Sequence, residues 1–117
     1  MKTVLVVSGE AGVRISIRHA LMLERYAVLA AENASQALEI SNSHRERSLH
    51  LLIADAGLPD LSAFELAEAI VANRSDTRVL IAGKHADQRL AGAGYSFLKK
   101  PIIVPELVRI VNLILKD

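Results

Sequence analysis

Five short runs of apolar residues, each followed by a stretch with helical character, constrain this chain more than any other feature. The runs occupy residues 4–7, 27–31, 49–54, 79–82 and 95–98. Short, mostly apolar runs are typical of β-strands that are covered on both faces. Strands that alternate with helices build parallel sheets. Each helix forms a right-handed crossover that returns the chain to the end of the sheet where the previous strand began. The pattern therefore predicts an α/β fold with helices on both faces of one sheet.

Local signals place the ends of several helices. Ser62 followed three residues later by Glu65 is a capping box and predicts the start of the third helix. Pro105 suits the first position of the last helix. Gly92 and Gly94 interrupt the stretch before the fifth strand, so the fourth helix is expected to span about two turns.

Five strands and five helices in alternation predict a flavodoxin-like (βα)5 sheet, doubly wound, with strand order 2-1-3-4-5. In such sheets, ligand chemistry lies at the carboxyl ends of the strands, close to the switch point between the first and third strands. This rim is expected to hold Ser8, Gly9, Glu10, Asp55, Ala82 and Lys100.

Composition limits the remaining choices. A chain of 117 residues with 51% hydrophobic residues predicts one domain over residues 1–117, without an effector domain. No apolar run reaches the length of a membrane span, and the absence of cysteine excludes thiolate metal sites and makes the cytoplasm the expected location. A net charge of +1 with dispersed arginines argues against nucleic-acid binding.

Two segments resemble one protein family. Residues 55–60 read Asp-Ala-Gly-Leu-Pro-Asp, and residues 97–101 read Phe-Leu-Lys-Lys-Pro. An aspartate that ends a strand and is followed by Leu-Pro, together with a lysine before proline after the fifth strand, resembles the response-regulator receiver domains of two-component signalling. The resemblance covers nearly the whole chain.

The resemblance implies roles for four residues. Asp55 would be the phosphoacceptor, whose carboxylate attacks a phosphoryl group on a partner histidine. Lys100 would contact the phosphoryl oxygens or the free Asp55 carboxylate. Phe97 would be the aromatic switch residue, and Ala82 replaces the hydroxyl residue that ends the fourth strand in this family. The plainer alternatives are a turn aspartate, a surface lysine and a core phenylalanine.

The first loop departs from the family pattern. Ser8 and Gly9 stand where receiver domains carry two acidic residues, and only Glu10 beside them is acidic. Protein ligands for Mg²⁺ would be reduced to Asp55, the Gly57 carbonyl and Glu10, so Mg²⁺ binding is expected to be weakened or absent. Glu10 fits better as a negative charge at the start of a helix.

These departures lead to a hypothesis about the site. Without the acidic pair, Lys100 alone can balance Asp55, which predicts an ion pair that needs no metal. The chain is then either a phosphorelay receiver that accepts phosphate on Asp55 from a histidine kinase or phosphotransfer protein, or a degenerate receiver that binds partners without phosphorylation. The fourth helix, fifth strand and fifth helix form the face that the family uses for dimerisation or for docking a downstream target.

Other functions fit the sequence less well. The small-residue loop 8–12 is consistent with a phosphate- or flavin-binding module, but it lacks the dinucleotide and P-loop spacings. An aspartate-based hydrolase of the haloacid dehalogenase type needs an acid two places after the nucleophile, where Gly57 stands. No enzyme activity beyond phosphoacceptor chemistry is predicted. Metal ligation is also not expected from the histidines, which are His19, His44, His50 and His85.

Overall fold

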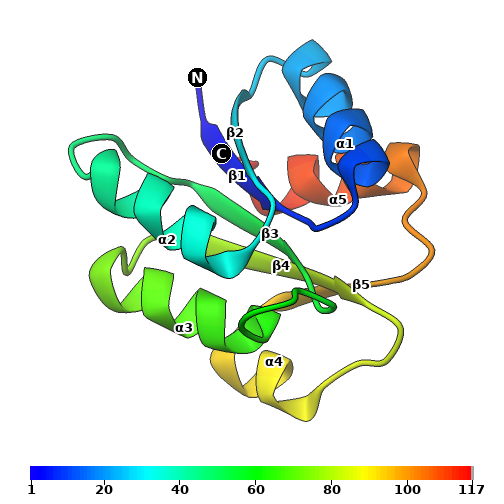
Figure 1. The fold of residues 1–117 in the computed structure, drawn as a ribbon. Helices are drawn as coiled ribbons and strands as arrows, with labels where there is room; N and C mark the ends of the chain where they lie inside the picture. The colour runs from blue at the N-terminus through cyan, green and yellow to red at the C-terminus, as the bar shows by residue number, and fades with distance from the viewer. Residues whose placement is uncertain (117) are drawn as a thin grey trace.

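The computed structural model describes residues 1–116, in which five strands alternate with five helices (Figure 1). In chain order the elements are β1 (Thr3–Val7), α1 (Ala11–Leu23), β2 (Ala27–Ala31), α2 (Ala34–Ser43), β3 (Leu51–Asp55), α3 (Ala63–Asn73), β4 (Arg78–Gly83), α4 (Gln88–Ala93), β5 (Ser96–Lys99) and α5 (Val104–Ile114).

The strands form one parallel sheet in the order β2-β1-β3-β4-β5. This arrangement confirms the predicted flavodoxin-like topology. Its register places Val7 of β1 beside Ala54 of β3, and Asp55 beside Ala82 of β4. The carboxyl ends of β1, β3 and β4 therefore lie side by side at one end of the sheet.

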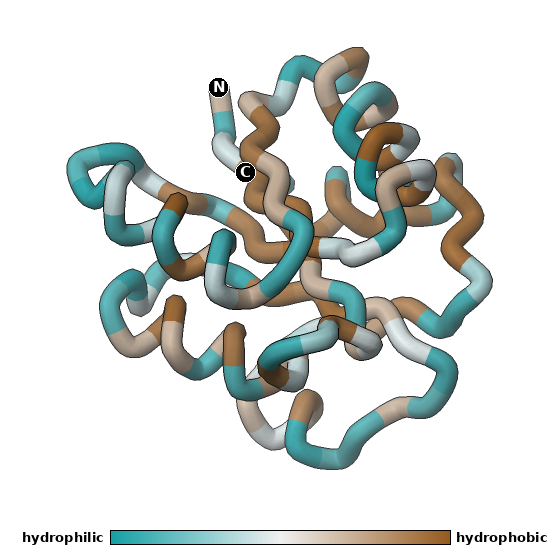
Figure 2. The backbone as a smooth tube through the Cα atoms, in the orientation of Figure 1, coloured by the Kyte–Doolittle hydropathy of each residue, from teal (hydrophilic) through white to brown (hydrophobic). Residues whose placement is uncertain are grey.

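Helices cover both faces of the sheet. In Figure 1, α1 and α5 lie on one face, and α2, α3 and α4 lie on the other. Successive strand residues alternate between the two cores: Val4 and Val6 pack with Ile17 and Leu107, whereas Leu5 packs in the core formed with α2 and α3. Figure 2 shows the corresponding pattern, with hydrophobic colour along the central strands and hydrophilic colour in most of the loops. Burial on both faces explains why the strands read as continuous apolar runs.

The strand boundaries differ from the prediction by one or two residues. Tyr95 was expected to open the fifth strand, but its N–H donates to the carbonyl of Leu90 at 2.8 Å and closes α4. Gly94 makes this closure feasible because it adopts a φ of 78°, a conformation that favours glycine. Similarly, Leu49 is buried but precedes β3, which begins at Leu51.

The helix signals are largely confirmed. Ser62 Oγ accepts a hydrogen bond from the Glu65 N–H at 3.0 Å, and the Glu65 carboxylate accepts one from the Ser62 N–H at 3.2 Å. The last helix begins at Val104, one residue before Pro105. The fourth helix has six residues, as its glycines predicted. None of the helices formed by residues 1–116 has both the length and the apolar character needed to cross a bilayer.

Candidate functional site

Asp55 is the last residue of β3, at the edge where β1, β3 and β4 end. Its side chain is only 7% exposed, although it is a carboxylate. A buried carboxylate needs hydrogen-bond donors or an opposite charge. The contacts around Asp55 therefore show how this chain meets that need.

Three groups donate to the Asp55 carboxylate. Lys100 Nζ lies 2.6 Å from Oδ1, and the Gly57 N–H donates to the same oxygen at 2.9 Å. Ser8 Oγ donates to Oδ2 over a longer distance of 3.4 Å. Each carboxylate oxygen thus has a protein partner, and Lys100 supplies the neutralising charge. The ion pair expected from the missing acidic residues is present in the structure.

The backbone holds Lys100 in this position. Its N–H donates to the Gly83 carbonyl at 2.8 Å, which fixes the end of β5 beside the end of β4. The Lys100–Pro101 peptide bond is cis. The Lys100 side chain is 22% exposed, so it reaches the buried carboxylate from the rim of the site.

Ser8 occupies the position of the first missing acid and is fully engaged. Its N–H donates to the Ala31 carbonyl at 3.1 Å, and its hydroxyl accepts the Glu10 N–H at 3.2 Å. Arg14 Nη1 donates to the Ser8 carbonyl at 2.7 Å. The loop after β1 therefore presents the Ser8 hydroxyl to Asp55, and the Arg14 guanidinium group holds the Ser8 backbone.

Gly9 and Glu10 lie further from the centre. Both are exposed, and Glu10 is the N-cap residue of α1 but its side chain makes no capping hydrogen bond. Its position is consistent with the expected charge interaction at the helix start. Glu10 also lines an open pocket of about 560 Å³ beside Asp55, together with Val13, Lys84, Lys100, Pro101 and Ile102.

Lys84 is a residue of this pocket that the sequence analysis did not identify. It follows β4 directly, and a position next to a strand end was the available signal. The pocket walls formed by Val13, Pro101 and Ile102 are apolar. The site thus combines two lysines and two carboxylates with an apolar wall.

The end of β4 contributes close packing in place of a hydroxyl. Ala82 is 1% exposed, and its carbonyl accepts the Ala56 N–H at 2.8 Å. A Cβ atom placed on Gly83 would lie 2.9 Å from the Cβ of Ala56, so this position needs glycine. Phe97 is half-buried, and its ring lies near Gly83 as part of the core packing.

The donor set does not fit a divalent cation. Within residues 1–116, no group of three or more histidine, cysteine, aspartate or glutamate side chains is arranged to hold a metal. Asp55 Oδ1 already accepts two hydrogen bonds, one of them from a cation. Mg²⁺ prefers several oxygen ligands that include carboxylates. Asp55, Gly57 and Glu10 thus make a poor magnesium site.

Asp60 connects the loop after β3 to α2, which the sequence analysis did not anticipate. Its carboxylate accepts the Ala34 N–H at 3.0 Å and the Ser35 N–H at 2.9 Å. These two backbone hydrogen bonds lower the pKa of the Asp60 carboxyl from its ordinary 3.8. Asp60 thereby caps a helix that begins 26 residues earlier in the chain.

Two of the four histidine side chains make hydrogen bonds within residues 1–116. His50 Nδ1 accepts the Thr3 N–H at 3.0 Å, and His44 Nδ1 lies 2.9 Å from the Ile40 carbonyl. The first contact ties the segment before β3 to β1, and the second lies at the end of α2. The histidines do not gather near Asp55, whose pocket is lined by other residue types.

The chain is similar to known proteins in both sequence and fold. A family model described as the response regulator receiver domain matches residues 4–112. The receiver domain of the hybrid histidine kinase CckA is 26% identical, with a TM-score of 0.82 over 97% of this chain and 99% of that chain. No curated protein sequence matches the chain significantly.

Two other solved structures show the same fold at lower identity. The chemotaxis response regulator CheY4 of Vibrio cholerae is 22% identical, with a TM-score of 0.85 over 98% of this chain and 99% of that chain. A CheY-like receiver domain protein from Methanospirillum hungatei JF-1 is also 22% identical, with a TM-score of 0.85 over 97% and 92% of the two chains.

Proposed function

Because the chain belongs to the response regulator receiver domain family, we propose that it is a degenerate receiver whose phosphoacceptor position is occupied by an Asp55–Lys100 ion pair. In this proposal, the Lys100 ammonium group balances the Asp55 carboxylate without a divalent cation, and the Ser8 hydroxyl donates to the second carboxylate oxygen. The chain then signals in the cytoplasm through partner binding, and phosphorylation of Asp55 is slow or absent.

Membership in the family fixes the general function. Receiver domains are signalling modules of two-component systems, and phosphorylation of an aspartate is their general mode of action. They generally bind Mg²⁺ at that site and interact with histidine kinases and effectors. The family match does not favour a phosphate- or flavin-binding module.

The contacts of Asp55 are the observation that carries the proposal. In a phosphoryl transfer, charge is spread over the equatorial oxygens, and a bound cation would neutralise it. Here Lys100 Nζ is the cation at 2.6 Å from Oδ1, and the positions of the acidic pair hold Ser8 and Gly9. A single ammonium group is a weaker substitute for a divalent ion.

The two Asp55 oxygens differ in their hydrogen bonds. Oδ1 accepts hydrogen bonds from Lys100 and Gly57, whereas Oδ2 accepts one long contact from Ser8 at 3.4 Å. Attack by Oδ2 would leave the ion pair intact. The transferred group would then enter a site in which Ala82 offers no hydroxyl to bind it.

Partner contacts form the second part of the proposal. We assign docking of a downstream protein or a second copy to the face formed by α4, β5 and α5. β5 is one of the two edge strands of the sheet, and α4 beside it is only six residues long. Unpaired strand edges favour association with another chain.

Intact-protein mass spectrometry tests the proposal directly. The protein is incubated with MgCl₂ and phosphoramidate, beside Asp55→Asn as the control that lacks the nucleophile. We expect the wild-type protein to gain little or no phosphoryl group, because the site lacks the ligands that bring Mg²⁺ to the reacting oxygens.

A gain of one phosphoryl group by most of the wild-type protein, absent from Asp55→Asn, would contradict the proposal. It would show that Lys100 suffices for the chemistry and that the chain is a phosphorylatable receiver. A Ser8→Asp/Gly9→Asp variant checks the assay, because restoring both acids should restore labelling.

A further inference from the structure

A second polar surface lies at the opposite end of the sheet from Asp55. α2 ends at Ser43 and α3 at Asn73, and residues 44–50 lead from α2 into the start of β3. β3 runs from Leu51 at this edge to Asp55 at the other. A ligand here would therefore contact the protein without touching the Asp55 site.

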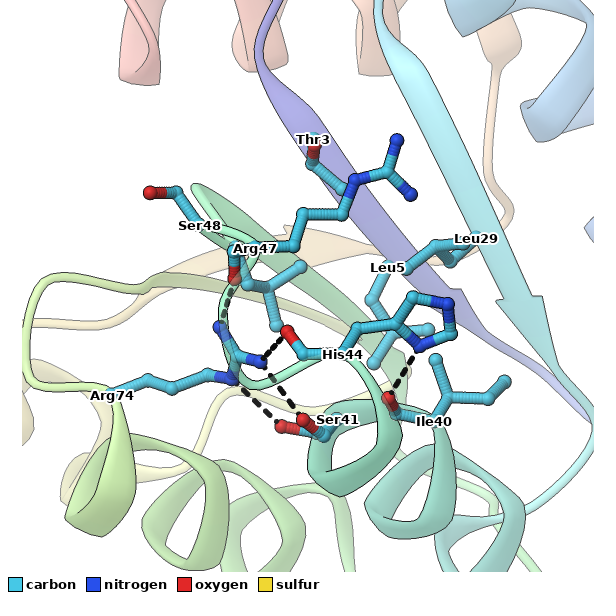
Figure 3. A pocket seen from close by; sticks show the side chains of 10 residues that line it. Thr3, Leu5, Leu29, Ile40, Ser41, His44, Arg47, Ser48 and Arg74 are labelled. Carbon is cyan, nitrogen blue, oxygen red and sulfur yellow. Dashed lines mark hydrogen bonds between the residues drawn. The ribbon is translucent and has the colours of Figure 1, made fainter.

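Arg74 lies on this surface, and Figure 3 shows its hydrogen bonds to Ser41, His44 and Arg47. Its Nε donates to Ser41 Oγ at 3.0 Å, and Nη2 donates to the carbonyls of Ser41 at 2.8 Å and His44 at 2.6 Å. Its Nη1 donates to the Arg47 carbonyl at 2.6 Å. These bonds satisfy carbonyls at the end of α2 and hold the guanidinium group in one orientation.

Two adjoining hollows extend from Arg74. The first, of about 230 Å³, is lined by Ser41, Asn42, Arg45, Asn73 and Arg74. The second, of about 300 Å³, shares Arg45, Asn73 and Arg74 with the first and continues past Arg47, Glu46 and Asp76. Because the hollows share three residues, they form one elongated depression, which we call the basic groove.

The acidic residues of the basic groove, Glu46 and Asp76, line only the second hollow, so the first hollow is the part whose side chains favour anions. Arg45 and Arg47 are exposed, and their guanidinium groups have no hydrogen bond to any described residue. The first hollow contains two arginines and two asparagine amides but no acidic residue. Arg74 has a structural role, because it caps the end of α2. The side chains of Arg45 and Arg47 are not needed for that capping.

The shape and composition of the groove distinguish between anionic ligands. Its lining contains no phenylalanine, tyrosine or tryptophan, so it lacks the stacking surfaces that single-stranded nucleic acids use. An exposed ion pair contributes little by itself, so a stable complex needs several carboxylates at once. Guanidinium groups bind carboxylates in a two-pronged geometry.

We propose that the basic groove binds an extended, glutamate- or aspartate-rich segment of a partner protein. The first hollow takes one carboxylate, which Arg45 binds and the positive charge of Arg74 attracts, and Arg47 contacts a second carboxylate further along the segment. This surface operates independently of the Asp55 site.

Fluorescence anisotropy with a labelled decapeptide of alternating glutamate and serine tests the proposal at low salt. The variant is Arg45→Glu/Arg47→Glu, which changes two exposed side chains without hydrogen bonds to the described residues. The matched control is Arg18→Glu/Arg109→Glu, the same charge change on α1 and α5 of the other face. We expect about tenfold weaker binding for the groove variant and less than about twofold for the control.

Three results would overturn the proposal. The first is an equal loss of affinity in both variants, which would reduce the effect to net charge. The second is the absence of peptide binding by the wild-type protein at low salt. The third is tighter binding of a single-stranded oligonucleotide of the same charge. Circular dichroism spectra of both variants would first show that the fold is unchanged.

Discussion

The hydrogen-bond donors around the Asp55 carboxylate do not contribute equally. Lys100 supplies a full positive charge at 2.6 Å, whereas Ser8 reaches the second oxygen only at 3.4 Å. Removing one partner from a buried ion pair leaves an uncompensated charge and costs about 3–5 kcal/mol. Asp55 is 7% exposed and Lys100 is 22% exposed, so Asp55 would lose more from the absence of its partner.

A double-mutant cycle measures this asymmetry. We expect Lys100→Met to lower the free energy of unfolding by about 2–3 kcal/mol, because it leaves the buried carboxylate without its cation. Asp55→Asn should cost about 1 kcal/mol, since Lys100 can then turn towards solvent. The double variant should recover part of the loss, with a coupling energy of about 1–3 kcal/mol.

Urea unfolding followed by circular dichroism provides these free energies. Lys99→Met serves as the control, because Lys99 is exposed and adjacent in sequence. Strict additivity of the two single changes would show that the contact does not stabilise the protein.

The residues of the site were largely predictable from the sequence, but their contacts were not. Asp55 and Lys100 were placed at the rim by the strand ends and given their roles by the resemblance to receiver domains, and the missing acids led to the expectation of an ion pair. The Ser8 contact, the place of Lys84 in the pocket and the capping role of Asp60 were missed. Each depends on a loop conformation, which no periodic pattern encodes.

At the scale of the elements, Asp60 couples the loop after β3 to the first turn of α2. Two backbone N–H groups donate to its carboxylate, and they lower its pKa from 3.8. Since the folded pKa lies below the unfolded value, the stabilisation is complete above pH 3.8. It is lost as the pH falls through the lower, folded value.

An Asp60→Asn variant should therefore be less stable than the wild-type protein at neutral pH, and this difference should shrink as the solution becomes acidic. Urea unfolding at pH 7 and again below pH 3.8 measures it. Glu39→Gln is the matched control, because Glu39 is an exposed carboxylate on α2 without a hydrogen bond in the described chain. A difference that stays constant across this range would show that the Asp60 charge does not stabilise α2.

α4 illustrates why element boundaries are harder to predict than the elements themselves. The glycines predicted a short helix, but they did not show that the Tyr95 N–H closes it. The Tyr95 side chain then packs against Phe64 of α3, with ring centroids 6.1 Å apart, and its hydroxyl donates to Glu68. Burial, together with Glu68, raises the pKa of Tyr95 to about 12. Contacts with α3 thus stabilise a helix that is too short to be stable alone.

At the scale of the whole molecule, the two ends of the parallel sheet carry different sets of polar side chains. The carboxyl ends carry Asp55, Lys100 and their pocket, and the amino ends lie beside the basic groove. The alternation of apolar runs and helices was sufficient to predict this fold, because burial on both faces leaves a parallel sheet few alternatives. The basic groove was not predicted, since its residues come from separate segments of the chain.

The central claim concerns the cation at Asp55, and a Mg²⁺ titration followed by ¹H–¹⁵N NMR tests it most directly. The comparison is with Ser8→Asp/Gly9→Asp, in which position 9 has room for a side chain because a Cβ there would lie 3.7 Å from the nearest atom. We predict that the Ala56 and Gly57 amide signals shift in the double variant and remain in place in the wild-type protein at the same Mg²⁺ concentration. Saturable shifts of both signals in the wild-type protein, at an affinity equal to that of the variant, would contradict a receiver site held by Lys100 without metal.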